Sequence, residues 1–150
     1  MLPETCKSLS KISNIVAIKE ASGNLSQIAE IASLCKDELL IYSGNDDQIL
    51  PVLSLGGIGA ISVISNIIPK DIHEMIYNFL DNNIIDSKNT QLKIIPLFKS
   101  LFAEVNPIPI KDALNILGYS VSKPRLPLLE ASANLHEKLR REMKNYGIIQ

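Results

Sequence analysis

Three short apolar segments, separated from one another by helical segments, constrain the fold of this chain most strongly. They cover residues 15–21, 39–43 and 60–64, and their aliphatic, strand-forming composition is typical of buried strands. Residues 25–35 repeat apolar side chains at helical spacing, and residues 47–55 form a second helical segment. Strands that alternate with helices of crossover length predict a parallel sheet covered by helices, with right-handed connections.

Turn and capping residues separate these segments. The Ser22-Gly23-Asn24 run predicts a turn followed by the N-terminus of a helix. Asp46 or Asp47 is expected to cap the helix over residues 47–55. The pair Gly56-Gly57 is expected to end that helix.

The rest of the chain is expected to be helical apart from one proline-rich stretch. Residues 106–109, which read NPIP, are expected to be non-helical, because each proline pushes its predecessor toward extended geometry. The helices predicted outside the strand region cover residues 3–11, 69–82, 86–102, 111–117 and 129–146.

Charge, hydropathy and cysteine usage exclude several classes of function. The 150 residues carry 15 basic and 16 acidic side chains without a basic run, so no nucleic-acid partner is expected. Polar residues interrupt every apolar stretch, and the first residues lack a signal-peptide pattern, so no membrane association is expected. Cys6 and Cys35 lack metal-ligand spacing, which favours a reducing cytoplasm as the location. No metal and no organic cofactor are called for.

Lys19 is the one residue whose position indicates chemistry. Alternation along a strand places it on one face with Ile15, Ala17 and Ala21, while Glu20 lies on the other face. It ends its strand, at the edge where parallel α/β folds bind ligands. An apolar environment favours the neutral amine, which attacks a ketone or aldehyde to form an imine. The plainer alternative is a lysine that extends from this edge into solvent.

Four motifs resemble segments of the dihydrodipicolinate synthase family. Residues 18–25 (IKEASGNL) resemble its Schiff-base segment, and residues 42–46 (YSGND) resemble its next strand and glycine-containing turn. Residues 55–63 (LGGIGAISV) resemble the strand that closes its barrel, and residues 104–111 (EVNPIPIK) resemble its asparagine-proline signature. Gly118 and residues 125–128 (RLPL) fit the family as well, so the motifs occur in the family's order and extend over nearly the whole chain.

The resemblance implies an α/β fold. Residues 1–83 would form the C-terminal part of a TIM (β/α)8 barrel, and residues 84–150 a C-terminal helical extension. It gives Lys19 the nucleophile role and places the backbone of Gly44 and Ile61 at the substrate pocket. By composition alone, Gly44 would be a residue with positive φ in a turn and Ile61 a core residue. Tyr42 is given no role and is expected to face the helical layer.

The resemblance also implies an activity. In the family, the matching lysine condenses with pyruvate, and the resulting enamine attacks aspartate semialdehyde in lysine and diaminopimelate biosynthesis. These two small molecules are the expected substrates. Two alternatives stay open: a related 2-keto acid aldolase, such as N-acetylneuraminate lyase, and a non-catalytic remnant or half of a split enzyme.

The chain departs from the family in length. A complete TIM barrel needs eight strands and about 250 residues, whereas only the counterparts of the last strands are found here. The motifs for the proton relay, the second-substrate arginine, the carboxylate-binding turn and the lysine feedback site are not found in this sequence. The chain is therefore expected to be inactive alone, and to require a separate N-terminal half or self-association, with a homo-oligomer as the expected state.

Overall fold

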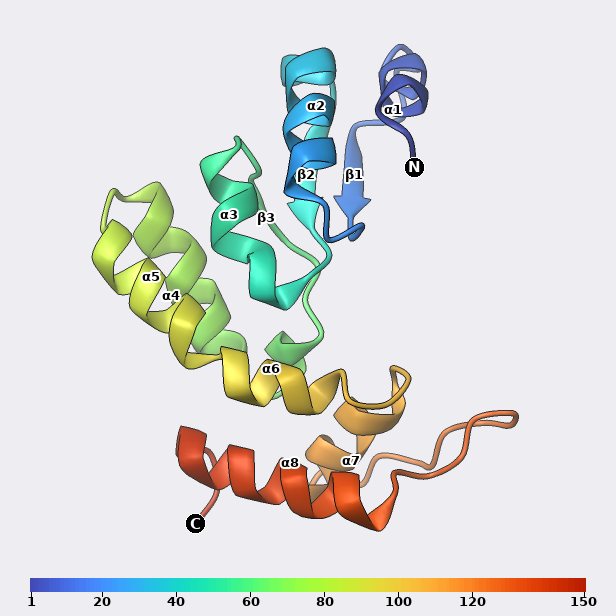
Figure 1. Ribbon diagram of the computed structural model, residues 1–150, viewed down its shortest axis with the longest axis vertical. Helices are drawn as coiled ribbons and strands as arrows, with labels where there is room; N and C mark the ends of the chain where they lie inside the picture. The colour runs from blue at the N-terminus through green and yellow to red at the C-terminus, as the bar shows by residue number, and fades with distance from the viewer. The chain divides into compact units, whose positions relative to one another are not determined.

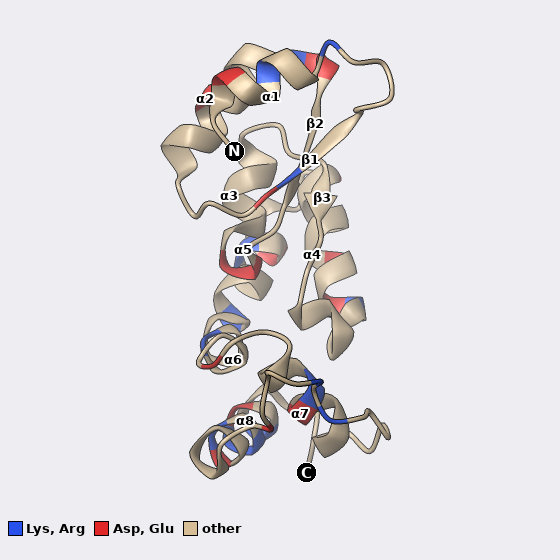
Figure 2. Ribbon diagram, turned by 90° about the vertical axis from the view of Figure 1, so that its right-hand side faces the viewer, with Lys and Arg blue, Asp and Glu red and all other residues tan.

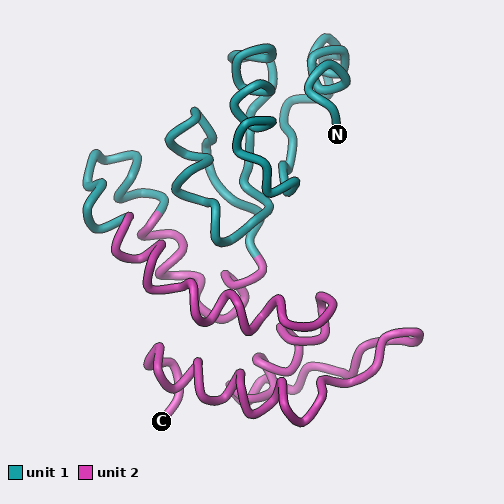
Figure 3. The backbone as a smooth tube through the Cα atoms, viewed as in Figure 1, with its two compact units in different colours: residues 1–62, 76–87 teal, residues 63–75, 88–150 magenta.

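The computed structural model describes residues 1–150 and divides into two compact units (Figure 3). Unit 1 comprises residues 1–62 and 76–87, and unit 2 comprises residues 63–75 and 88–150. The boundary crosses two helices, α4 (Pro69–Leu80) and α5 (Ile84–Lys93).

A three-stranded parallel sheet forms the centre of unit 1. Strands β1 (Ala17–Glu20), β2 (Leu40–Ser43) and β3 (Gly59–Ala60) lie side by side in chain order. Helices α2 (Leu25–Cys35) and α3 (Ile49–Ser54) connect them and lie on one side of the sheet (Figures 1 and 2). The predicted parallel sheet covered by helices is confirmed. The covering helices bury strands that are too short and apolar to be stable when exposed.

An aliphatic cluster fills the space between the sheet and its helices. Helix α1 (Pro3–Leu9) packs against α2 and contributes to it. Ile15 also packs against this cluster, so the prediction that it shares a face with Lys19 is wrong. The cause is that β1 begins only at Ala17, after Ile15. The buried members of the cluster are Cys6, Ile28, Ile31, Cys35, Leu39, Ile41 and Val52.

The ends of the second and third crossover segments differ from the predictions. The acidic pair does not cap α3, because Asp46 and Asp47 lie inside a 3-10 turn, η2 (Asp46–Gln48), that precedes it. The third strand is shorter than predicted, and the chain turns into η3 (Ile64–Asn66) where a strand was expected. The predicted cap of α2 is confirmed, since the Asn24 side chain accepts hydrogen bonds from two backbone N–H groups of its first turn.

Unit 2 is helical. Helices α6 (Ile95–Leu101), α7 (Ile108–Ile116) and α8 (Ala133–Tyr146) pack on one another. The start of α8 is capped by the Ser132 hydroxyl, which accepts from Leu135 N at 3.2 Å. Acidic and basic residues are interspersed along α8 (Figure 2). The buried side chains of these helices include Leu97, Leu101, Ala113, Leu135, Leu139 and Met143.

Prolines account for two wrong predictions in the C-terminal part. The single helix predicted over residues 86–102 is two helices, because Pro96 lies in the first turn of α6, where its missing N–H costs least. The stretch at residues 106–109 is not wholly non-helical, because α7 begins at Ile108 and holds Pro109 in its first turn. No helix of the chain is long and apolar enough to cross a bilayer.

Candidate functional site

Lys19 lies on the sheet face that the helices do not cover. Its neighbour Ile18 packs against the aliphatic cluster, and Glu20 is only 3% exposed and accepts a hydrogen bond from Gln27 Nε2 of α2 at 3.3 Å. Successive side chains of a strand point to opposite faces, so Lys19 points away from α2. Its side chain is exposed on that face. This arrangement confirms that Lys19 and Glu20 lie on opposite faces.

Gly44 lets the Lys19 side chain lie close against the backbone that follows β2. Its N–H donates to the Glu20 carbonyl at 2.7 Å, which continues the pairing of β1 and β2 beyond Ser43. A Cβ atom at position 44 would lie 2.9 Å from Lys19 Cε and 2.7 Å from Ala21 Cβ, well inside van der Waals contact. Gly44 does not have a positive φ. The expectation of a left-handed turn is therefore wrong, and close packing is the reason for glycine here.

Tyr42 lies on the same face as Lys19, although it was expected to face the helical layer. The residues on either side of it, Ile41 and Ser43, are buried, and Tyr42 is the register partner of both Lys19 and Gly59. A Cβ atom on Gly59 would lie 3.2 Å from Tyr42 Cε1, so the ring covers β3 at that glycine. Because successive side chains of a strand point to opposite faces, the alternation along residues 39–43 could have placed Tyr42 on the face of Lys19.

Ile61 follows β3 at the same edge of the sheet. Its N–H donates to the Ser43 carbonyl at 2.8 Å, so its backbone lies beside the end of β2. Its side chain is 49% exposed, so the prediction from composition that Ile61 is a core residue is wrong. The structure thus places Lys19, Gly44 and Ile61 at the carboxyl ends of three adjacent strands, with Lys19 and Gly44 in contact.

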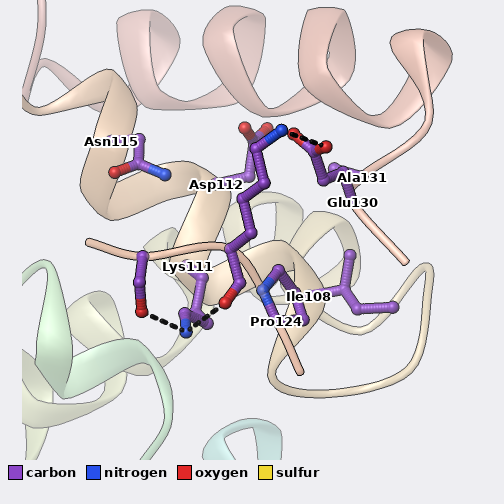
Figure 4. Close-up of a pocket in the computed structure, with 9 residues that line it drawn as sticks. Ile108, Lys111, Asp112, Asn115, Pro124, Glu130 and Ala131 are labelled. Atoms are coloured by element: carbon purple, nitrogen blue, oxygen red, sulfur yellow. Dashed lines mark hydrogen bonds and ion pairs between the residues drawn. The ribbon is translucent and has the colours of Figure 1, made fainter. Parts of the chain in front are cut away.

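A small cavity of about 40 Å³ lies in unit 2, between α7 and the segment that leads to α8 (Figure 4). Lys111 Nζ donates to the Lys123 carbonyl at 3.2 Å, and Lys123 Nζ pairs with Glu130 at 2.7 Å. These contacts occupy charged groups around the cavity. All of its lining residues belong to unit 2, so it is not part of the sheet edge that carries Lys19.

His136 of α8 contacts α7 through Asp112. Its Nδ1 atom lies 3.0 Å from Asp112 Oδ2, and the side chain is 41% exposed. No group of three or more His, Cys, Asp and Glu side chains is arranged to hold a metal ion.

These observations define a class of protein. Consecutive parallel strands joined by covering helices are the arrangement of part of a TIM barrel, and a lysine and a closely packed glycine lie at the carboxyl edge, where TIM-barrel enzymes carry their active sites.

Comparison with known proteins identifies the family. The model of the Dihydrodipicolinate synthetase family matches residues 1–146. A 4-hydroxy-tetrahydrodipicolinate synthase from Caldicellulosiruptor saccharolyticus is 55% identical over 148 residues, which are 99% of this chain and 50% of that protein. The chain belongs to the dihydrodipicolinate synthetase family, and it spans about half the length of the curated relatives it matches.

Solved structures agree with this assignment. The crystal structure of dihydrodipicolinate synthase from Thermotoga maritima matches with a TM-score of 0.95 and 39% identity, over 99% of this chain and 52% of that one. The enzyme from Acinetobacter baumannii, solved in complex with pyruvate, matches with a TM-score of 0.92 and 34% identity, over 99% of this chain and 51% of that one. The TIM-barrel fold expected from the motifs is therefore confirmed for the part of the barrel present here.

Proposed function

We propose that this chain is the C-terminal half of a pyruvate-dependent class I aldolase in which Lys19 forms the Schiff base. The observation that carries the proposal is the contact between Lys19 Cε and Gly44, at the carboxyl edge of the sheet. A glycine at this position lets the amine-bearing carbon of Lys19 lie directly against the backbone, and that backbone offers polar groups to a small keto acid without a side chain in the way. A relative of this chain was solved with pyruvate bound, which supports the choice of substrate.

The proposed chemistry uses the amine of Lys19 as the nucleophile. The Lys19 amine attacks C2 of pyruvate, and loss of water gives an iminium ion. The iminium nitrogen accepts the electron pair of a C3–H bond as that proton leaves, which gives an enamine. The enamine carbon then attacks the aldehyde carbon of aspartate semialdehyde, in lysine and diaminopimelate biosynthesis. The backbone of Gly44 and Ile61 lines the pyruvate pocket in this proposal.

The unpaired edges of the sheet favour a partner for this half. In the chain, β1 and β3 are edge strands, and each pairs only with β2. Exposed edges of this kind pair readily with further strands. In the proposed enzyme these edges, and the face that carries Lys19, are covered by an N-terminal half or by a second copy of the chain. The enzyme acts as a homo-oligomer in the cytoplasm.

Trapping of the imine tests the proposal. The purified chain is incubated with pyruvate, reduced with borohydride, and mapped by mass spectrometry. Imine formation needs only Lys19 and pyruvate, so an adduct on Lys19 is expected even though the complete aldol reaction is expected to need a partner, and Lys19→Ala or Lys19→Arg should abolish the adduct. Lys88→Arg, on the exposed face of α5, is the matched control and should label like the wild type. A folded chain that forms no adduct would overturn the activity and favour the non-catalytic remnant. Faster formation of an adduct from N-acetylneuraminate than from pyruvate would favour the related aldolase.

A further inference from the structure

The residue next to the proposed nucleophile is a buried carboxylate. Glu20 is 3% exposed and points to the helical side of the sheet. Its Oε2 atom accepts from Ser22 N at 3.0 Å and from Ser22 Oγ at 2.8 Å, and its Oε1 atom accepts from Gln27 Nε2 at 3.3 Å. A buried carboxylate is costly unless it is hydrogen-bonded, and here both oxygen atoms have donors. The side chain thus holds the turn that follows β1 against the start of α2.

The backbone of Glu20 is hydrogen-bonded to the other part of the site, at Gly44. The Glu20 carbonyl accepts from Gly44 N at 2.7 Å, and Gly44 is the residue against which Lys19 Cε lies. One residue therefore joins three parts: the turn through its carboxylate, β2 through its carbonyl, and Lys19 through the peptide bond. A displacement of Glu20 would move Lys19 and Gly44 relative to each other.

A second contact fixes the same turn from the far side. Gln48 Nε2 donates to the Gly23 carbonyl at 3.1 Å, and Asn24 caps α2 through its side chain. Gly23 has a φ of +74°, which glycine adopts without strain. The turn is thus held at both ends, and Glu20 is its buried anchor on the β1 side.

We propose that Glu20 is a positioning residue for Lys19, through the turn that its carboxylate holds and the Gly44 N–H that its carbonyl binds. It touches neither the amine nor a substrate, and its effect is on the geometry in which Lys19 meets a keto acid. This inference rests on the proposed function of Lys19, and one of its two measurements does not require imine formation.

The test compares Glu20→Leu, Glu20→Gln and wild type in the full chain. Leucine keeps the side-chain volume and removes both acceptor oxygens. Glutamine keeps one oxygen that accepts from Ser22, and its NH2 group can donate to the amide oxygen of Gln27 once the Gln27 amide has rotated. The first measurement is the rate of borohydride-trapped pyruvate adduct on Lys19 as a function of pyruvate concentration. The second is hydrogen exchange of the Gly44 amide, with the Leu40 amide as internal control, since Leu40 N donates to Val16 O at 3.0 Å at the other end of β1.

The expected result separates positioning from general stability. Glu20→Leu should lower the limiting rate of adduct formation by about tenfold or more, because a misplacement of reacting groups by about 1 Å costs about 100-fold in rate. The half-saturating pyruvate concentration should be unchanged. Exchange of Gly44 should become faster while that of Leu40 stays slow, and Glu20→Gln should restore both readouts.

Other outcomes overturn the proposal. A wild-type limiting rate in Glu20→Leu, or unchanged protection of Gly44, would show that Glu20 does not position Lys19. If wild type forms no adduct, the proposed function fails and the exchange of Gly44 alone decides the positioning. If Glu20→Leu does not fold, Ser22→Ala removes a single donor to Oε2 and should give a smaller change of the same kind in both measurements.

Discussion

The Cε atom of Lys19 lies 2.9 Å from the point that a Cβ atom on Gly44 would occupy. The Ala21 methyl group and the Glu20 carbonyl close the same space, at 2.7 Å and 3.1 Å. The Glu20 carbonyl is part of the backbone and the Ala21 methyl group is attached directly to it, so neither can rotate away from a new side chain. A side chain at position 44 can therefore be accommodated only by displacing Lys19 or by separating β1 from β2.

Replacing Gly44 by alanine should affect both stability and chemistry. We expect a loss of about 1–3 kcal/mol in the free energy of unfolding, because overpacking forces strain on the neighbours. The rate of pyruvate trapping on Lys19 should fall by about tenfold or more, because the amine is displaced. Urea unfolding and borohydride trapping measure the two effects.

Gly56→Ala is the control for that substitution. Gly56 has a φ of +91°, and no atom lies within 4 Å of the point that a Cβ atom there would occupy, so alanine is strained but meets nothing. It should lower stability and leave the labelling rate of Lys19 unchanged. Trapping at the wild-type rate in Gly44→Ala would contradict the close packing of Gly44 against Lys19.

The Glu38 carboxylate, which binds two lysines in and just after α1, predicts an acid-sensitive contribution to stability. Glu38 accepts from Lys11 Nζ at 2.8 Å, from Lys7 Nζ at 2.7 Å and from Ser10 Oγ at 3.1 Å. These contacts lower the pKa of Glu38 from 4.5 to about 2. Because the pKa is lower in the folded state, the contribution is present above pH 4.5 and is lost as the pH falls toward 2.

The measurement is the urea midpoint of wild type and Glu38→Gln between pH 6 and pH 2. The difference between the two proteins should be largest near neutral pH and should shrink as the pH falls, and added salt should reduce it, since the pairs are partly exposed. Glu74→Gln, which removes the looser pair with Lys70 at 3.6 Å, should show no such dependence. A pH-independent difference for Glu38→Gln would refute the assignment.

Tyr146 should contribute to the stability of unit 2. Its hydroxyl donates to Asp71 Oδ2, and Lys93 Nζ lies 4.2 Å from the centroid of its ring. Burial, and then Asp71, raises the pKa of Tyr146 well above its usual value of 10. The raised pKa means that the stabilising contribution is complete below pH 10 and is lost as the pH rises above it.

Tyr146→Phe removes the donor and leaves the Asp71 carboxylate without it. The free energy of unfolding at neutral pH should fall by about 1–3 kcal/mol. Tyr119→Phe is the matched control, since Tyr119 is 62% exposed, and it should change stability little. Spectrophotometric titration should show one tyrosine of the wild type that ionises only when the chain unfolds. Equal stability of the two variants would argue against a structural role for the Asp71 contact.

Local signals were enough to predict the fold where they agreed with one another. Helix α2 begins at Leu25 and ends at Cys35 as predicted, because its cap Asn24 and its apolar spacing give the same boundaries. The break before α6 was missed, since Pro96 is compatible both with a kink and with a new first turn. Periodicity does not distinguish these two, because the buried side chains of α5, Ser87 and Gln91, are polar and give no apolar stripe that could change at the break.

The candidate site was predicted in part. Alternation correctly placed Lys19 opposite Glu20. The resemblance put the backbone of Gly44 at the substrate pocket, and in the structure Gly44 lies against Lys19. The reason for Gly44 was wrong, because a close approach between strands leaves no trace in the local sequence. Strand alternation could have placed Tyr42 on the face of Lys19, but the contact of its ring with Gly59 depends on the register of β2 and β3 and could not be predicted.

Two buried thiols offer a way to follow the packing of α1. Cys6 and Cys35 are both fully buried and free, in the cluster between α1 and α2. Burial, and then the neighbouring Cys35, raises the pKa of Cys6 from 9.0, so little reactive thiolate forms at neutral pH. We expect both thiols to resist iodoacetamide in the folded chain and to react when urea unfolds it.

The two thiols should differ when α1 alone is loosened. Glu38→Gln removes the contacts that join Lys7 and Lys11 to the turn after α2, so α1 should open more often. Alkylation of Cys6, on α1, should therefore become faster in this variant, while that of Cys35, on α2, should follow global unfolding. Equal acceleration of both thiols would show that α1 and α2 open together, and rapid alkylation of Cys6 in the folded wild type would show that α1 is not held by this cluster.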